Sequence, residues 1–180
     1  MLDKGQQERL LKIARQTLEE HIRKGRISEF KEIDPALTQK CGVFVTLTKK
    51  GQLRGCIGYI QPILPLDETI SKMAIESSTG DPRFPPVSSE ELKEIHIEIS
   101  VLTPLQLIND VNKIEVGKHG LYIRKGLFSG LLLPQVATSY AWDKWQFLDQ
   151  TCIKAGLSPG DWREKDSQIF IFSAQIFGEE

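Results

Sequence analysis

The stretch LRGCIGYI, residues 53–60, places a cysteine and an arginine where they could act together. Arg54 and Cys56 are two residues apart, so in a strand their side chains share one face, with Cα atoms about 6.5–7 Å apart. A guanidinium at that distance would lower the pKa of the thiol and favour the nucleophilic thiolate. Gly55 and Gly58 flank the cysteine, and glycine within a strand indicates a bulge or a close approach by backbone or ligand. The stretch therefore predicts a thiol site or, because free cysteine is often buried, a small packing residue.

A catalytic thiol also needs a base or an oxyanion donor. His119 lies in VGKHGL, a glycine-flanked turn of the kind that often carries site residues. We take His119 as a weak candidate base, with an ordinary turn residue as the alternative. His96 falls on the predicted polar face of a strand beside Glu98, and we interpret it as structural or solvated.

A second candidate segment is DPRFPP, residues 81–86, in which prolines brace two charged side chains and one aromatic side chain. Asp81 and Arg83 could bind or polarise a ligand, and Phe84 could anchor it, because proline holds such a segment in place at little entropic cost. The alternative is a rigid connector with Phe84 in the core and both charges on the surface. Gln135, a neutral donor and acceptor after a predicted buried strand, is a further candidate binding residue.

Composition restricts the class of protein. The 180 residues include 23 basic and 24 acidic side chains, a net charge of −1, so the strong positive field of most duplex-binding proteins is absent and a nucleic-acid partner is disfavoured. Three dispersed histidines and three dispersed cysteines form no known metal motif, so we predict no metal site. Nothing in the residues identifies a cofactor.

The sequence also predicts where the protein resides. The N-terminal stretch MLDKGQQERLLKIARQ is charged from residue 3, and no apolar run approaches the length of a membrane span. An odd number of cysteines excludes a complete disulfide framework. We therefore expect a soluble cytoplasmic protein with reduced thiols and no membrane contact.

Hydrophobic periodicity predicts interleaved helices and antiparallel strands. Helices are expected over residues 4–22, 67–78 and 143–155, with a single helical turn at 32–37 and a capping box from Ser88 to Glu91. Strands are expected as a hairpin over 43–60, at 95–102, as a hairpin over 120–134, and as one closing strand over 168–177. Without a regular βαβ alternation the fold class is α+β, with a mostly antiparallel sheet and flanking helices. Length suits one domain over residues 1–180, or one domain with a smaller lobe.

Taken together, these stretches resemble the AMMECR domain family. The resemblance rests on LRGCIG at residues 53–58, and continues through GVFVTL, DPRFPP, ISVLTP, GLLLPQVA and the terminal QIF, over nearly the whole chain. The sequence is similar to the stand-alone prokaryotic members of the family. These are called protein A of a system with a Memo-family protein and a radical-SAM protein. The resemblance implies two unequal lobes with a cleft between them, into which the LRGCIG strand faces.

The resemblance implies no established reaction, and two hypotheses stay open. In the first, the cleft binds a small molecule, a modified peptide or a partner protein, and its Memo-family and radical-SAM companions are candidate partners. In the second, the protein is a thiol enzyme with Cys56 as nucleophile, assisted by Arg54, and with Asp81 or His119 as the acid/base. The lack of a secure base beside Cys56 favours the binding module. The family pattern around residue 119 does not require histidine.

Overall fold

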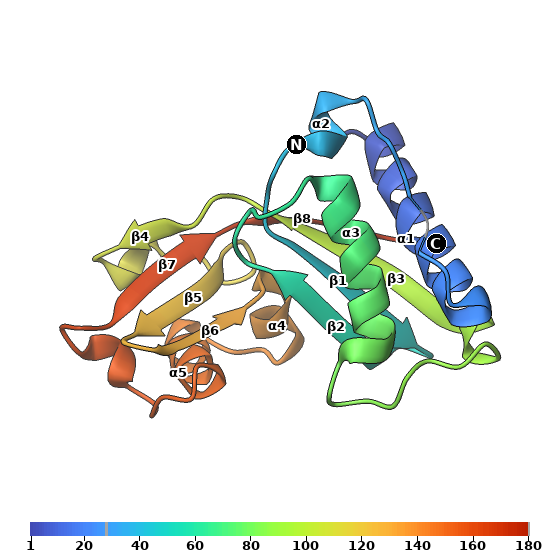
Figure 1. The fold of residues 1–180 in the computed structure, drawn as a ribbon. Coiled ribbons are helices and arrows are strands. Elements are labelled where there is room, and N and C mark those ends of the chain that lie inside the picture. Colours follow the sequence, from blue (N-terminus) through green and yellow to red (C-terminus); the bar gives the residue numbers. More distant parts are fainter. Residues whose placement is uncertain (28, 180) are drawn as a thin grey trace. The chain divides into compact units, whose positions relative to one another are not determined.

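The computed structural model describes residues 1–27 and 29–179, which form two compact units. The first unit comprises Met1–Leu102 and Gln175–Glu180, and the second comprises Thr103–Ala174. Each unit combines helices with an antiparallel sheet of its own (Figure 1), which confirms the predicted α+β class.

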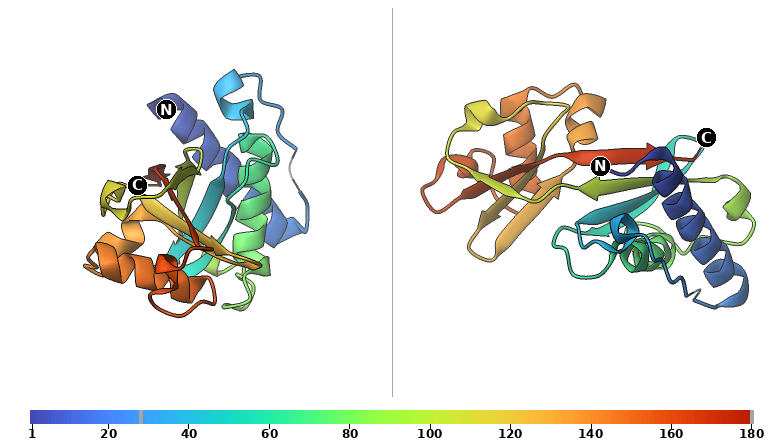
Figure 2. Two further views of the ribbon diagram at one scale, coloured as in Figure 1. Left: turned by 90° about the vertical axis from the view of Figure 1, so that its left-hand side faces the viewer. Right: turned by 90° about the horizontal axis from the view of Figure 1, so that it is seen from above.

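The first unit is built on a four-stranded sheet in the order β2-β1-β3-β8. Helices α1 (Lys4–Lys24) and α3 (Leu66–Ile75) contact each other and the sheet, and Figures 1 and 2 show both helices on one face of the sheet. The strands are β1 (Val43–Lys49), β2 (Gln52–Tyr59), β3 (Ile95–Leu102) and β8 (Ala174–Gly178), and the helices are α1 (Lys4–Lys24), α2 (Pro35–Thr38) and α3 (Leu66–Ile75).

Alternation in the sequence explains which face of this sheet is covered. Val45 on β1 pairs with Ile99 on β3, and both side chains are fully buried in the core of the unit. Helix α1 begins at a capping box formed by Asp3 and Gln6, and it ends at Gly25 in the left-handed conformation. The helices therefore form where local sequence signals start and stop them, and the sheet holds them by its apolar face.

The second unit has a sheet in the order β4-β7-β5-β6. Its core gathers around Phe147 and Leu148, both fully buried. The strands are β4 (Gln106–Ile108), β5 (Gly120–Lys125), β6 (Phe128–Leu132) and β7 (Gln168–Phe172), and the helices are α4 (Pro134–Ser139) and α5 (Lys144–Lys154).

Most predicted elements are confirmed, but the closing segment is not one strand. Residues 168–177 divide at Ser173 into β7 and β8, which belong to different sheets. The backbone of Ser173 instead exchanges hydrogen bonds with Thr103: its carbonyl accepts from the Thr103 amide at 2.9 Å, and its amide donates to Thr103 Oγ1 at 2.9 Å. The apolar alternation continues through this point, so the sequence pattern did not reveal the break. Strand β4 and helix α4 were also not predicted.

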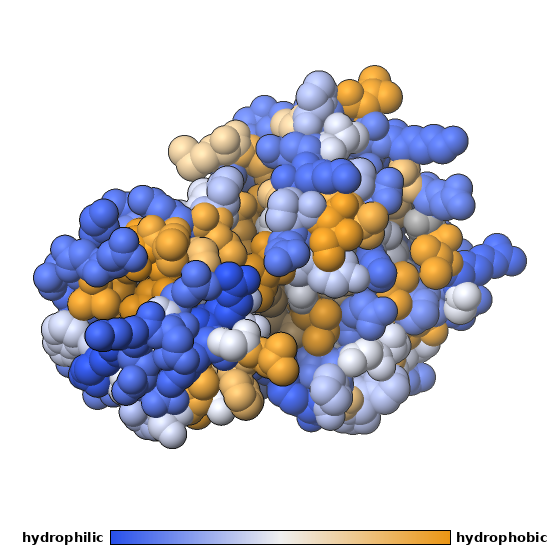
Figure 3. All heavy atoms as spheres, turned by 60° about the vertical axis from the view of Figure 1, so that its left-hand side comes forward, coloured by the Kyte–Doolittle hydropathy of each residue, from blue (hydrophilic) through white to orange (hydrophobic). Residues whose placement is uncertain are grey.

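The surface in Figure 3 is largely hydrophilic, with apolar side chains in separate groups. Large apolar side chains such as Leu127 and Phe128 are exposed in the second unit, and Ile27 and Ile33 are exposed in the first. Among the helices of the described residues, none combines the length and apolar character needed to cross a membrane.

Candidate functional site

Strand β2 forms one edge of the first sheet and carries a bulge at its arginine. Leu47 of β1 pairs with Gly55, but the next residue, Thr48, pairs with Leu53, so Arg54 is the extra residue. A bulge redirects a side chain from the regular alternation of a strand. Arg54 therefore need not share the face of Cys56, as a regular strand would require.

Gly55 is required because another segment lies directly on the strand. A Cβ atom added at Gly55 would lie 1.9 Å from the carbonyl oxygen of Ser77. Ser77 belongs to a single π-helical turn, Glu76–Gly80, that follows α3. Its hydroxyl donates to the Val45 carbonyl at 2.7 Å and accepts from the Ile57 amide at 2.9 Å, so it bridges β1 and β2. The small side chains of this turn thus permit close packing on the strand.

The backbone of Cys56 is held by the DPRFPP segment. Its amide donates to Asp81 Oδ2 at 2.9 Å, and its carbonyl accepts from Arg83 Nη2 at 3.2 Å. Arg83 also grips Asp81 with two parallel bonds, Nε to Oδ1 at 2.9 Å and Nη2 to Oδ2 at 2.7 Å. Backbone groups that an edge strand would leave open are here satisfied by two side chains. The Arg83 side chain is half-exposed, whereas that of Asp81 is buried.

The surroundings of the Cys56 thiol favour its protonated form. It is half-buried, and its sulfur lies 3.2 Å from Thr46 Oγ1. Burial raises the pKa of the thiol above its usual value, and the hydrogen bond with Thr46 and the charge of Arg83 oppose this increase only in part. The negative charges of Asp81 and Glu98 raise the pKa further. A thiol in these surroundings is mainly protonated near neutral pH.

The Arg54 guanidinium binds groups other than the Cys56 thiol. Its Nε and Nη2 donate to the two carboxylate oxygens of Glu91, at 3.1 and 3.0 Å, and its Nη1 donates to the Pro85 carbonyl at 2.8 Å. The guanidinium that lowers the pKa of the thiol is that of Arg83. An effect of Arg54 on Cys56 stays a prediction. Arg54 holds the pKa of Glu91 down to about 2.

The other predicted binding residues of this unit have structural contacts. Gly58 lies under the ring of Phe44, and a Cβ at this position would come within 2.4 Å of that ring. Phe84 is half-buried, with the guanidinium carbon of Arg83 at 5.5 Å and that of Arg54 at 6.0 Å from its ring centroid. Phe84 is thus neither in the core nor fully exposed, and it contacts the two arginines of the site.

His119 and Gln135 belong to the second unit. The His119 ring accepts a hydrogen bond from the Glu115 amide at 3.2 Å through Nδ1, which closes the turn 115–119. That contact supports the alternative of a turn residue. Gln135 lies in the first turn of α4 and is half-buried.

Three residues of the site were missed by sequence reasoning: Thr46, Ser77 and Glu91. Glu91 was expected only to cap a helix, and its carboxylate does accept from the Ser88 amide at 3.0 Å. The segment 91–93 is a short 3-10 turn. The main partner of the Glu91 carboxylate is the guanidinium of Arg54. The run of small residues before Asp81 was the only signal for Ser77. Across the described ranges, no group of three or more His, Cys, Asp or Glu side chains is placed to hold a metal ion.

The fold and the site define an α+β protein in which the LRGCIG strand is a sheet edge fastened by a proline-braced segment. The AMMECR1 family model matches residues 11–177, and the chain belongs to this family. It is 47% identical to Protein PF1979 of Pyrococcus furiosus, over 95% of this chain and 87% of that protein. A protein of Thermococcus onnurineus is 49% identical, over 95% of this chain and 89% of its own length.

A solved structure has the same fold. The crystal structure of the uncharacterized protein PH0010 from Pyrococcus horikoshii matches with a TM-score of 0.95 at 45% sequence identity. The match covers 99% of this chain and 94% of that one. The similarity confirms the resemblance to the AMMECR family that the motifs indicated.

Proposed function

We propose that this protein is a binding module without catalytic chemistry of its own, and that the outer edge of β2 is its binding surface. The observation that carries the proposal is the state of Cys56. Its amide, carbonyl and thiol all have partners within the unit, and burial raises the pKa of its thiol. A nucleophile would need the opposite: a low pKa and a nearby base.

Arg83 is the proposed contact for the ligand. Asp81 and the Cys56 carbonyl occupy Nε and Nη2 of its guanidinium, and no hydrogen bond found within the described residues uses Nη1. The side chain is 46% exposed. Because its inner edge is already fixed, the outer edge is a preorganised donor, which lowers the entropic cost of binding. Nη1 can donate a charge-assisted hydrogen bond to a carboxylate or phosphate oxygen, so we propose a ligand that carries one of these groups.

Phe84 would supply the apolar part of the same surface, since its ring lies next to Arg83. The ligand class remains a small molecule, a modified peptide or a partner protein. Family resemblance makes a Memo-family protein and a radical-SAM protein the proposed partners. The cleft that the resemblance implies remains a prediction. The roles of His119 and Gln135 as site residues also remain predictions.

The thiol-enzyme hypothesis has less support. Arg54, its proposed activator, is bound to Glu91, and the carboxyl of Asp81 is held by Arg83 and the Cys56 amide. The candidate acid/base Asp81 has its pKa held far below the usual range by the Arg83 guanidinium, so it is a poor proton donor and a weak base.

The test is a binding titration with defined probes. O-phosphoserine and succinate would be titrated into the full chain while amide shifts are followed by NMR, and purified Memo-family and radical-SAM proteins would be tested by calorimetry. We expect shifts at Cys56, Arg83 and Phe84, and loss of binding in Arg83→Gln. Arg23→Gln, at the exposed end of α1, is the matched control.

If no probe and no companion protein binds, the binding module is rejected. If a product forms and Cys56→Ala abolishes its formation, the enzyme hypothesis replaces it.

A further inference from the structure

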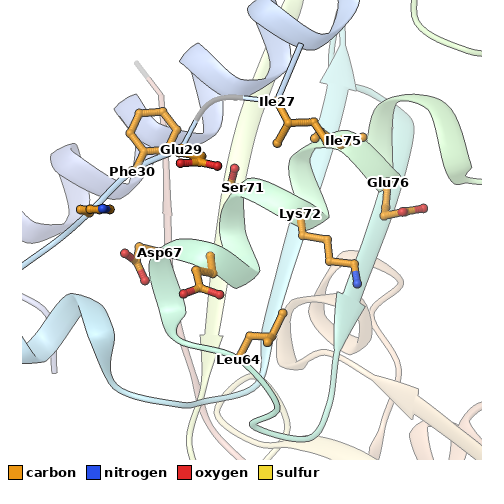
Figure 4. A pocket seen from close by; sticks show the side chains of 11 residues that line it. Ile27, Glu29, Phe30, Leu64, Asp67, Ser71, Lys72, Ile75 and Glu76 are labelled. Carbon is orange, nitrogen blue, oxygen red and sulfur yellow. The ribbon is translucent and has the colours of Figure 1, made fainter. Parts of the chain in front are cut away.

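The first unit contains a pocket of about 590 Å³ that none of the β2 site residues lines. It lies between α3 and the segment after α1, which contributes Ile27, Glu29 and Phe30 (Figure 4). Ser71, Lys72 and Ile75 line it from α3. A volume of this size is typical of sites for small organic ligands.

Asp67 is an unpartnered buried acid in the wall of this pocket. The residue is 4% exposed, and its Oδ1 atom is buried with no hydrogen-bond partner among the described residues. Asp67 lies in the first turn of α3, where the helix dipole favours negative charge but supplies no hydrogen bond to Oδ1. Buried carboxyl oxygens nearly always have a partner, because losing hydration without one costs free energy. The group that Oδ1 lacks is a donor.

The surrounding charges favour a cationic donor. Besides Asp67, the wall carries Glu29, Glu68 and Glu76, against two lysines, Lys31 and Lys72. Acidic groups thus outnumber basic ones by two. Lys72 does not serve as the missing donor, because its ammonium is engaged with Tyr59, at 5.6 Å from the ring centroid.

Apart from Ser71, the remaining wall is apolar. Ile27, Phe30, Leu64 and Ile75 border the pocket from both sides. Figure 4 shows Phe30 and Ile27 on the segment that faces α3. A wall that combines these apolar side chains with an excess of acidic ones suits a ligand with an apolar body and a cationic donor at one end.

From these contacts we propose that the pocket binds a small organic cation, a primary amine or guanidine with an apolar body. Its charged group pairs with the carboxylate of Asp67, and its body packs against Phe30, Leu64 and Ile75. Glu29 at the rim adds attraction for the positive charge. This site is separate from the proposed anion-binding edge of β2, and it takes a ligand of opposite charge.

The test uses three probes of similar shape on the full chain. Phenethylamine carries the cation, 2-phenylethanol is its neutral analogue and 3-phenylpropionate its anionic one. In an NMR titration we expect phenethylamine alone to saturate, with shifts at residues 29–31 and 67–76. Asp67→Asn should weaken its binding roughly tenfold or more, the effect of losing one charge-assisted hydrogen bond. Asp166→Asn, which removes an exposed carboxylate in the second unit, should leave it unchanged.

A second variant keeps the test decisive if Asp67→Asn fails to fold. Glu29 is exposed, so Glu29→Lys should fold normally and weaken phenethylamine binding several-fold by reversing one rim charge. The proposal is overturned if phenethylamine does not bind, if the alcohol or the carboxylate binds equally well, or if both variants bind like the wild type. None of these outcomes depends on anion binding at Arg83, so the two proposals can fail separately.

Discussion

The carboxylate of Asp81 is bound twice by Arg83, at 2.9 and 2.7 Å, and this pair in turn holds both backbone polar groups of Cys56. The two residues thereby act on β2 as a neighbouring strand would, donating to its carbonyl and accepting from its amide. The LRGCIG strand and the DPRFPP segment are consequently one structural assembly. Its rigid part is the peptide of Cys56, and its exposed part is the outer edge of Arg83.

The thiol of Cys56 should react slowly with alkylating agents. Since burial raises its pKa, the thiolate should appear only above the ~8.5 of a free thiol. The rate of modification by iodoacetamide should therefore rise at higher pH than for a model thiol. Peptide mass spectrometry would distinguish Cys56 from Cys41 and Cys152, whose pKa values burial also raises. Rapid modification of Cys56 near neutral pH in the native protein would contradict this and revive the enzyme hypothesis.

Gly55→Ala should destabilise the first unit by at least about 2 kcal/mol, because the added Cβ would meet the Ser77 carbonyl and no flexible side chain can yield there. Urea unfolding measures the change. Gly5→Ala is the matched control, since Gly5 lies in α1 and its added Cβ would find only an ordinary contact at 3.5 Å. That control should be neutral or stabilising by about 0.5–1 kcal/mol. Equal stabilities of the two variants would show that the π-helical turn can move.

Arg54→Lys should loosen the segment that carries the three prolines. A single ammonium cannot replace a guanidinium that reaches both Glu91 oxygens and the Pro85 carbonyl. We expect a loss of roughly 1–2 kcal/mol in the free energy of unfolding, with faster amide exchange over residues 84–91. Arg23→Lys, at the exposed end of α1, controls for the substitution itself. If exchange over 84–91 stays at the wild-type rate, Arg54 does not anchor this segment.

Acid should destabilise the first unit through Glu91. The pKa of Glu91 is about 2 in the folded protein, chiefly through Arg54 and then through the Ser88 amide, against about 4.3 for a free glutamate. Because the folded value is the lower one, the contribution to stability is complete above about pH 5 and is lost as the pH falls towards 2. The stability difference between the wild type and Glu91→Gln should therefore shrink over this range in urea titrations. A difference that does not change with pH would contradict the assigned ion pair.

Asp81 should also contribute to the loss of stability in acid, because the Arg83 guanidinium holds the pKa of the Asp81 carboxyl below its usual value. Glu164→Gln is a suitable control for Glu91→Gln, because Glu164 is an exposed glutamate of the second unit.

Sequence reasoning succeeded where the signals are local. Helices α1 and α5, the hairpin β1–β2 and strand β3 all follow from residue types at fixed spacings. It failed where a periodic pattern runs through a change of partner, as at Ser173 between β7 and β8. Periodicity reports which face is buried, and it does not report which sheet buries it.

Sequence reasoning selected the residues of the candidate site but did not predict the contacts that they make. Glycine, cysteine and arginine at 53–58 and the charged pair at 81–83 were recognised from their types. Assuming a regular strand put Arg54 beside Cys56, and the bulge opposite Leu47 and Thr48 invalidated that assumption. A bulge depends on how two strands pair, which no single stretch of sequence specifies.

By itself, the sequence determined the α+β class, most helices and strands, and the family. Only the tertiary structure decided that Glu91 pairs with Arg54 and that Ser77 packs on Gly55. It also decided that Asp67 lies buried in a pocket wall, where its Oδ1 atom has no hydrogen-bond donor among the described residues. The physical reason is range. Caps, turns and alternation act over a few residues, whereas the pKa of the Cys56 thiol and the partner of the Arg54 guanidinium depend on groups that folding brings from 10 to 42 positions away.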